Sequence, residues 1–109
     1  MRALIIDPTT LSVKEQNVAP GLEPLQKIVG GYIEAIYPAR FDAWWGDHHV
    51  YLNEEGRLDP VIAAQRWSLQ GWPEPWLVGP AIVLLGDDSG DEVDCTLSLE
   101  GLRARVTFL

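Results

Sequence analysis

The sequence has little cysteine, few basic residues and no long apolar run. Cys95 is the only cysteine in 109 residues, which excludes an internal disulfide and a cysteine-based structural zinc site and fits a reducing compartment. No apolar stretch approaches the roughly 20 residues that cross a bilayer. The N-terminal apolar run, residues 3–6, is too short for an export signal. We therefore expect a cytoplasmic protein that does not contact a membrane.

The charge is strongly unbalanced toward acid. Eight Lys and Arg residues stand against sixteen Asp and Glu residues, which gives a net charge of -8. Because the basic residues are scattered along the chain, no basic patch is expected, and direct binding to nucleic-acid phosphates is not predicted. The acidity can serve solubility alone, or it can favour a basic partner surface, such as one that normally holds DNA.

The apolar content of 47% is enough for a hydrophobic core, and the length predicts one domain over residues 1–109. Local patterns predict an α+β fold, with a mainly antiparallel sheet of four to five strands and two or three short helices. Strands are expected at residues 2–6, 11–15, 32–37, 48–52 and 81–85. The first two of these strands are separated by a turn at residues 7–10, so they are expected to form a hairpin.

Two helices are predicted from spacing and capping. Leu22, Leu25, Ile28 and Val29 recur at helical spacing, and Gly30-Gly31 follows them with the chemistry of a helix C-cap. The second helix is predicted over residues 60–69, because Asp59 and Pro60 are favoured at the N-cap and first helical positions. The tail, residues 97–109, stays open between a terminal helix, which we prefer, and a strand at residues 106–108.

Two segments together resemble a known protein family. They are Leu25–Glu34, which contains Gly30-Gly31, and Asn53–Leu58, which contains a turn closed by Gly56; Val78-Gly79-Pro80 then precedes an apolar strand. Over about residues 3–98 the chain is similar to the domain of unknown function 3846 family. That family occurs in bacteria, phages and mobile elements, often near antirestriction genes. The resemblance therefore implies a cytoplasmic function that serves a mobile element. It implies no particular reaction.

One position departs from the family pattern. Members usually carry an Asn-Arg pair after the glutamate-glycine turn, and this chain has Gln65-Arg66 there. If the family's Asn contacts a ligand, the longer amide of Gln65 alters that contact.

The preferred functional hypothesis is a non-enzymatic binding protein of a phage or mobile element that acts on a host macromolecule or defence factor. The sequence shows no catalytic constellation but has five tryptophans, which flank or bracket two irregular loops, and tryptophan is favoured at interfaces. An acidic loop at residues 86–94 could add a contact for a basic partner, although a solvated loop is the simpler explanation of its composition. A host protein is the expected partner, and an edge strand beside an exposed tryptophan would suit a homodimer. The predicted partner-binding residues are Trp44, Trp45, Trp72, Trp76, Asp87, Asp88 and Asp91.

The first alternative is a small-molecule site for a nucleotide-like ligand. It would lie between the Gly30-Gly31 turn and the Glu54-Glu55 turn. Gly30-Gly31 is not a phosphate-binding loop, because it lies at the C-terminus of its helix and phosphates bind at N-termini. No cofactor is predicted. The residues expected to line this pocket are Gln26, Gly30, Gly31, Glu34, Asn53, Glu54, Glu55, Gln65 and Arg66.

The second alternative is a small enzyme built on Asp47, His48 and His49. Adjacent residues of a strand point to opposite faces, so the two histidines are not expected to share a metal ion. The sequence supports no catalytic or metal-ligating assignment beyond this possibility.

Overall fold

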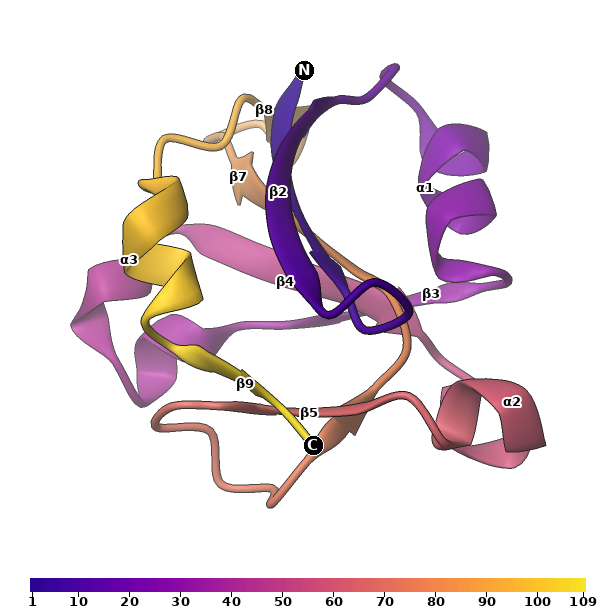
Figure 1. Cartoon of the computed structure of the whole chain (residues 1–109). Coiled ribbons are helices and arrows are strands. Elements are labelled where there is room, and N and C mark those ends of the chain that lie inside the picture. The colour runs from indigo at the N-terminus through magenta and orange to yellow at the C-terminus, as the bar shows by residue number, and fades with distance from the viewer.

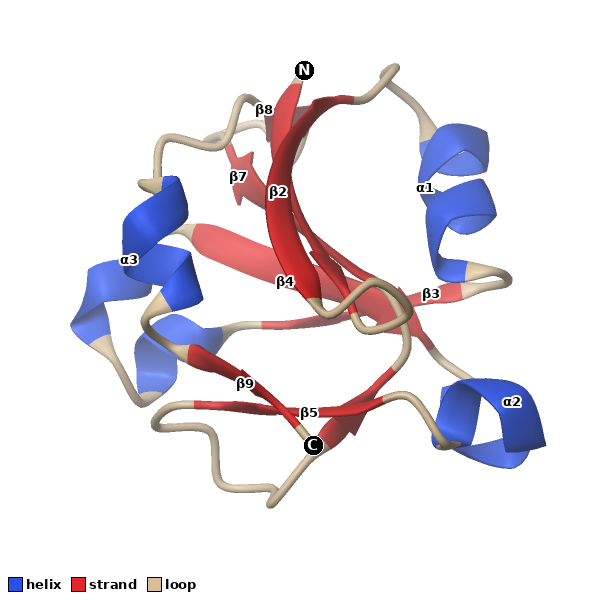
Figure 2. Cartoon of the chain, viewed as in Figure 1, coloured by secondary structure: helices blue, strands red, loops and turns tan.

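The computed structural model describes residues 1–109 and contains nine strands and three helices (Figures 1 and 2). The α+β class predicted from the sequence is confirmed. The strands are β1 Arg2–Asp7, β2 Ser12–Asn17, β3 Ile33–Ile36, β4 His48–Asn53, β5 Arg66–Leu69, β6 Leu77–Val78, β7 Ala81–Gly86, β8 Glu92–Val93 and β9 Val106–Phe108.

The strands form two sheets. The larger sheet has six strands, one or two more than predicted, in the order β2-β1-β7-β4-β3, with β8 also paired to β7. All its pairings are antiparallel. The predicted N-terminal hairpin is confirmed, because β1 and β2 pair along their full length from Arg2 opposite Asn17 to Asp7 opposite Ser12. A second, three-stranded sheet has the order β6-β5-β9.

The helices are α1 Leu22–Val29, α2 Pro60–Ala63 and α3 Leu99–Arg103. No helix combines the length and the apolar character that crossing a membrane requires. As predicted, α1 ends at Gly30, whose φ of 83° lies in the left-handed region that glycine favours. The predicted cap of α2 is also present, because the Asp59 carboxylate accepts hydrogen bonds from the first free backbone N–H groups of the helix.

Strand β7 lies at the centre of the larger sheet, between β1 and β4. Its residues Ala81–Leu84 are fully buried, and their side chains alternate between two hydrophobic clusters. One cluster packs under α1 and contains Ile82 and Leu84. The other contains Ala81 and Val83 and is covered by α3 and the smaller sheet. Figure 1 accordingly shows α1 and α3 on opposite sides of the β1–β2 hairpin.

The predicted helix over residues 60–69 is wrong beyond Ala63. Residues Arg66–Leu69 form β5, which pairs with both β6 and β9. Trp67 and Leu69 are buried while Arg66 is exposed, which is the period-two pattern of a strand. The burial of a whole tryptophan against distant strands therefore outweighs the local helix signal.

The C-terminal tail contains both of the elements that the sequence left open. It begins with the helix α3, whose Ser98 accepts a hydrogen bond from the N–H of Gly101. It then continues as the strand β9, in which Phe108 lies opposite Trp67. The preferred reading of the tail as a helix alone is therefore wrong for its last residues.

Truncation of the central strand should cost much of the stability. We expect Ile82→Ala to lower the free energy of unfolding by about 2–5 kcal/mol, because a fully buried side chain is lost and a cavity remains. Val61→Ala, at a position that is 71% exposed, should change it by less than about 0.5 kcal/mol. Urea unfolding followed by tryptophan fluorescence measures both. Equal effects of the two substitutions would contradict the central role of β7.

Candidate functional site

The two segments that carry the family resemblance meet in space, at the turn between α1 and β3 and the turn after β4. The Asn53 side-chain amide donates to the Val29 carbonyl at 3.2 Å, and its oxygen accepts from the N–H of Glu55 at 2.8 Å. The backbone of Glu54 donates to the carbonyl of Tyr32 at 2.9 Å. The two motifs, which are separate in the sequence, thus form one hydrogen-bonded unit, the motif unit.

The close approach of Asn53 favours glycine at position 31. A Cβ atom at Gly31 would lie 3.0 Å from the Asn53 Nδ2 atom, tighter than an ordinary van der Waals contact. The backbone N–H groups of Gly30 and Gly31 both donate to the carbonyl of Gln26, at 2.9 and 3.1 Å. These amides close the helix and are therefore not available to a ligand.

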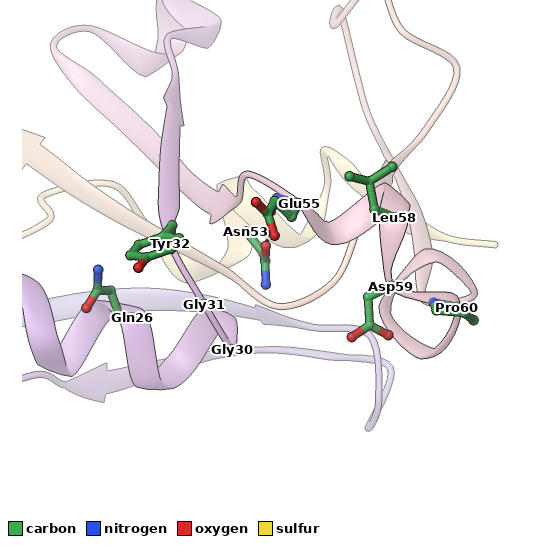
Figure 3. Close-up of a pocket in the computed structure, with 9 residues that line it drawn as sticks. All are labelled: Gln26, Gly30, Gly31, Tyr32, Asn53, Glu55, Leu58, Asp59 and Pro60. Carbon is green, nitrogen blue, oxygen red and sulfur yellow. Dashed lines mark hydrogen bonds between the residues drawn. The ribbon is translucent and has the colours of Figure 1, made fainter.

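A surface cavity of about 570 Å³ lies beside this unit, and we name it the motif cavity (Figure 3). Its volume falls within the roughly 300–1,000 Å³ of typical ligand sites. Gln26 and Tyr32 are drawn on one side of it, and Leu58, Asp59 and Pro60 on the other. The lining residues are Gln26, Gly30, Gly31, Tyr32, Asn53, Glu55, Leu58, Asp59 and Pro60.

The motif cavity offers negative charge without a basic residue. Glu55 and Asp59 line it, no Lys, Arg or His does, and neither carboxylate takes part in a salt bridge. The N–H of Glu55 is already bonded to Asn53. Because free donors are few and the charge is negative, the cavity suits a cation or a neutral hydrogen-bond donor better than a phosphate.

Exposed apolar side chains border the motif cavity. Tyr32 is 68% exposed and Leu58 is 81% exposed, and both belong to its lining. Val61 follows in α2 and is also exposed. Neighbouring exposed apolar residues with carboxylates between them are typical of a surface that another molecule covers.

The structure brings together five of the nine residues that the sequence assigned to a pocket: Gln26, Gly30, Gly31, Asn53 and Glu55. Sequence reasoning missed Tyr32, Leu58, Asp59 and Pro60. Asp59 and Pro60 were interpreted only as a helix start, although both directly follow the second motif. Their position next to the motif was the signal that could have included them.

The other four predicted pocket residues lie elsewhere. Glu34 and Glu54 line a smaller cavity of about 120 Å³, where desolvation and then the charge of Glu54 raise the pKa of Glu34. The Arg66 guanidinium lies over the Trp76 ring, 5.3 Å from its centroid. Gln65 packs with its side-chain oxygen buried and without a hydrogen-bond partner.

The tryptophans differ in their exposure. Trp45 is fully buried in the core, and Trp44 packs edge-on against it at 5.3 Å while the Arg105 guanidinium covers its ring. Trp72 is partly buried against Phe41. Of the four tryptophans expected to meet a partner, only Trp44, Trp72 and Trp76 therefore keep any exposed surface.

The acidic loop connects β7 to β8, and Asp87 organises it. One carboxylate oxygen of Asp87 accepts from the N–H groups of Ser89 and Asp91, each at 2.9 Å. Asp88 and Asp91 are exposed and have no salt bridge. The acidity of this loop is therefore partly structural and partly free for contacts.

The two histidines lie on opposite faces of β4, as predicted. His48 Nδ1 is 2.8 Å from the carbonyl of Trp45, and its Nε2 accepts from the N–H of Thr96 at 3.0 Å. This arrangement requires the neutral ring, and burial lowers the pKa of His48 while the Trp45 carbonyl opposes that shift. The His48 side chain thus links two loops through hydrogen bonds.

His49 faces the other side of the sheet. Burial lowers its pKa, with Glu92 acting in the opposite direction. Its Nε2 atom is buried and has no hydrogen-bond partner. No group of three or more His, Cys, Asp or Glu residues is arranged to hold a metal ion.

Comparison with protein families gives one match. A family model described as a domain of unknown function (DUF3846) matches residues 1–105. No curated protein and no solved structure gives a significant match.

The motif unit should depend on the Asn53 side chain. We expect Asn53→Ala to lower the free energy of unfolding by about 1–3 kcal/mol, because the Val29 carbonyl and the Glu55 N–H lose their buried partner. Glu55→Ala, in the same turn, removes an exposed carboxylate that makes no hydrogen bond and should have little effect. Chemical denaturation compares the two variants. If Asn53→Ala left the free energy of unfolding unchanged, the two turns would be held independently of this side chain.

Stability should fall as pH decreases below about 6.5, the ordinary pKa of histidine. Because burial lowers the pKa of both His48 and His49, the unfolded chain binds more protons than the folded chain in this range. Urea unfolding between about pH 7.5 and about pH 5 measures the loss. The free energy of unfolding of the double variant His48→Gln/His49→Phe should change less with pH over the same range. A pH-independent wild type would contradict this assignment.

Proposed function

Since the chain belongs to the DUF3846 family, a domain of unknown function, we propose from its geometry that it is a non-enzymatic binding protein. In this proposal the motif cavity receives a cationic side chain of a protein partner, and the exposed apolar side chains around it cover the partner's apolar surface. The partner is a host macromolecule or defence factor in the cytoplasm. The protein binds it as a product of a phage or mobile element.

The observation that carries the proposal is the composition of the motif cavity. The two family segments converge on it, two carboxylates without a salt bridge line it, and Tyr32 and Leu58 stand exposed at its edge. Burying an exposed Leu or Tyr side chain gains about 25 cal/mol for each Å² of apolar surface removed from water. Carboxylates beside such residues supply orientation and specificity for a basic partner.

The binding surface extends from the motif cavity toward Trp76. The Arg57 guanidinium donates to the Trp76 carbonyl at 2.8 Å and pairs with Glu74 at 2.7 Å. Trp76 is thereby tied to the turn at Leu58 and is partly exposed. It is the tryptophan best placed to add contact area next to the cavity. Trp44, Trp72 and the acidic loop would be reached only by a larger partner or by a second copy of the chain.

The nucleotide-like alternative has less support. A phosphate would need basic side chains or free backbone amides, and the cavity lacks the first while Gly30, Gly31 and Glu55 use their amides internally. A small molecule with an amine or guanidine group agrees better with Glu55 and Asp59. This ligand class is the second candidate.

The double variant Tyr32→Ser/Leu58→Ser should weaken binding. We expect wild-type protein to capture a specific host protein from lysate, and the double variant to reduce that capture at least tenfold, equivalent to about 1.4 kcal/mol. Leu109→Ser removes another exposed apolar side chain, far along the chain, and serves as the matched control.

The charge contribution is tested on the same partner with Glu55→Gln/Asp59→Asn. Asparagine keeps the N-cap of α2, so this variant should fold normally, bind more weakly and show less dependence on salt. Undiminished capture by both double variants would place the binding surface elsewhere.

A further inference from the structure

A second cavity lies at the opposite end of β4 from Asn53, and we name it the aromatic cavity. Its volume is about 510 Å³, and its lining includes Tyr37, His49, Tyr51, Asp47, Asp87 and Asp88. The residues come from the start and middle of β4, the segment after β3 and the acidic loop. It shares no lining residue with the motif cavity, so an inference about it is independent of the proposed function.

Three aromatic rings follow one another along this cavity. The His49 ring lies 5.7 Å from that of Tyr37 and 4.7 Å from that of Tyr51, measured between centroids. Tyr51 is held in place because its hydroxyl donates to Glu92. Tyr37, in contrast, is 62% exposed, so most of its ring surface is free to be covered by a ligand.

The charged side chains that line the cavity are all acidic. Asp47, Asp87 and Asp88 line it and have no salt bridge, and no Lys or Arg is present. His49 is 7% exposed, yet its buried Nε2 has no hydrogen-bond partner. A buried ring nitrogen in this state leaves one hydrogen-bonding capacity of the imidazole unused.

We propose that the aromatic cavity binds an organic ammonium group, with the Tyr37 and Tyr51 rings and the neighbouring carboxylates stabilising its charge. Aromatic rings attract such cations through the negative potential of their faces. Carboxylates at the edge add long-range attraction and oppose anions.

An organic cation fits these residues better than a metal ion. The carboxylates and the histidine do not form a cluster of three or more ligands, whereas calcium requires six to eight oxygen ligands and zinc about four ligands in all. Two tyrosine rings contribute nothing to metal coordination but favour a substituted ammonium. The neutral ring of His49, favoured by its burial, adds no repulsion.

The test compares choline with 3,3-dimethylbutan-1-ol, which has the same shape and hydroxyl group but no charge. We expect choline to cause saturable NMR shifts of Tyr37, His49 and Tyr51, and the uncharged analogue to bind at least tenfold more weakly. A short peptide containing trimethyllysine distinguishes the source: tighter binding than choline indicates a protein side chain, and weaker binding indicates a small metabolite. Either of these results supports an ammonium site.

Matched variants locate the binding. Tyr37→Leu and Asp88→Asn should each weaken choline binding at least threefold, whereas Tyr37→Phe, which keeps the ring, and Asp91→Asn, which removes the same charge outside the cavity lining, should leave it unchanged. Equal binding of choline and its uncharged analogue would overturn the proposal. So would the absence of shifts, displacement of choline by manganese with selective broadening at Asp87 and Asp88, or full retention of binding by Tyr37→Leu.

Discussion

The structure depends on the burial of both faces of β7. Its four consecutive apolar residues, Ala81–Leu84, are removed from water completely, and a strand in that position needs a neighbour on each edge and a layer on each face. β1 and β4 supply the edges, while α1 on one side and α3 with the smaller sheet on the other supply the layers. The fixed position of β4 then determines where both cavities lie, because His49 stands at its beginning and Asn53 at its end.

Local patterns were sufficient where an element is specified by its own residues. The bounds of α1 agree with the apolar spacing and the glycine cap, and β7 begins at Ala81 because Pro80 precedes it. Local patterns failed to predict β5, because its partner β9 lies far away, at the C-terminal end of the chain. Nothing near Trp67 reveals that Phe108 will face it, whereas Asp59 and Pro60 give a strong but purely local helix signal.

The same distinction applies to the candidate site. The resemblance grouped Gly30-Gly31 with the turn at Asn53 because the two motifs occur in order, and the structure joins them through one amide side chain. Exposure could not be predicted in this way. Leu58 is exposed and Trp45 is buried, the reverse of what a bias toward tryptophan at interfaces suggests, because the volume of the core decides which large side chains it accepts.

The distribution of unused chemical groups also favours binding over catalysis. His48 uses both ring nitrogens for structure, Tyr51 donates to Glu92, and burial raises the pKa of the Cys95 thiol despite the nearby Arg2. A nucleophile or base that is engaged or held in its unreactive form contributes little to proton or acyl transfer. Apart from the buried His49 Nε2 atom, which has no hydrogen-bond partner, the fold leaves free negative charge beside exposed apolar and aromatic surface, at both ends of one strand. Surface of this composition is complementary to a basic group.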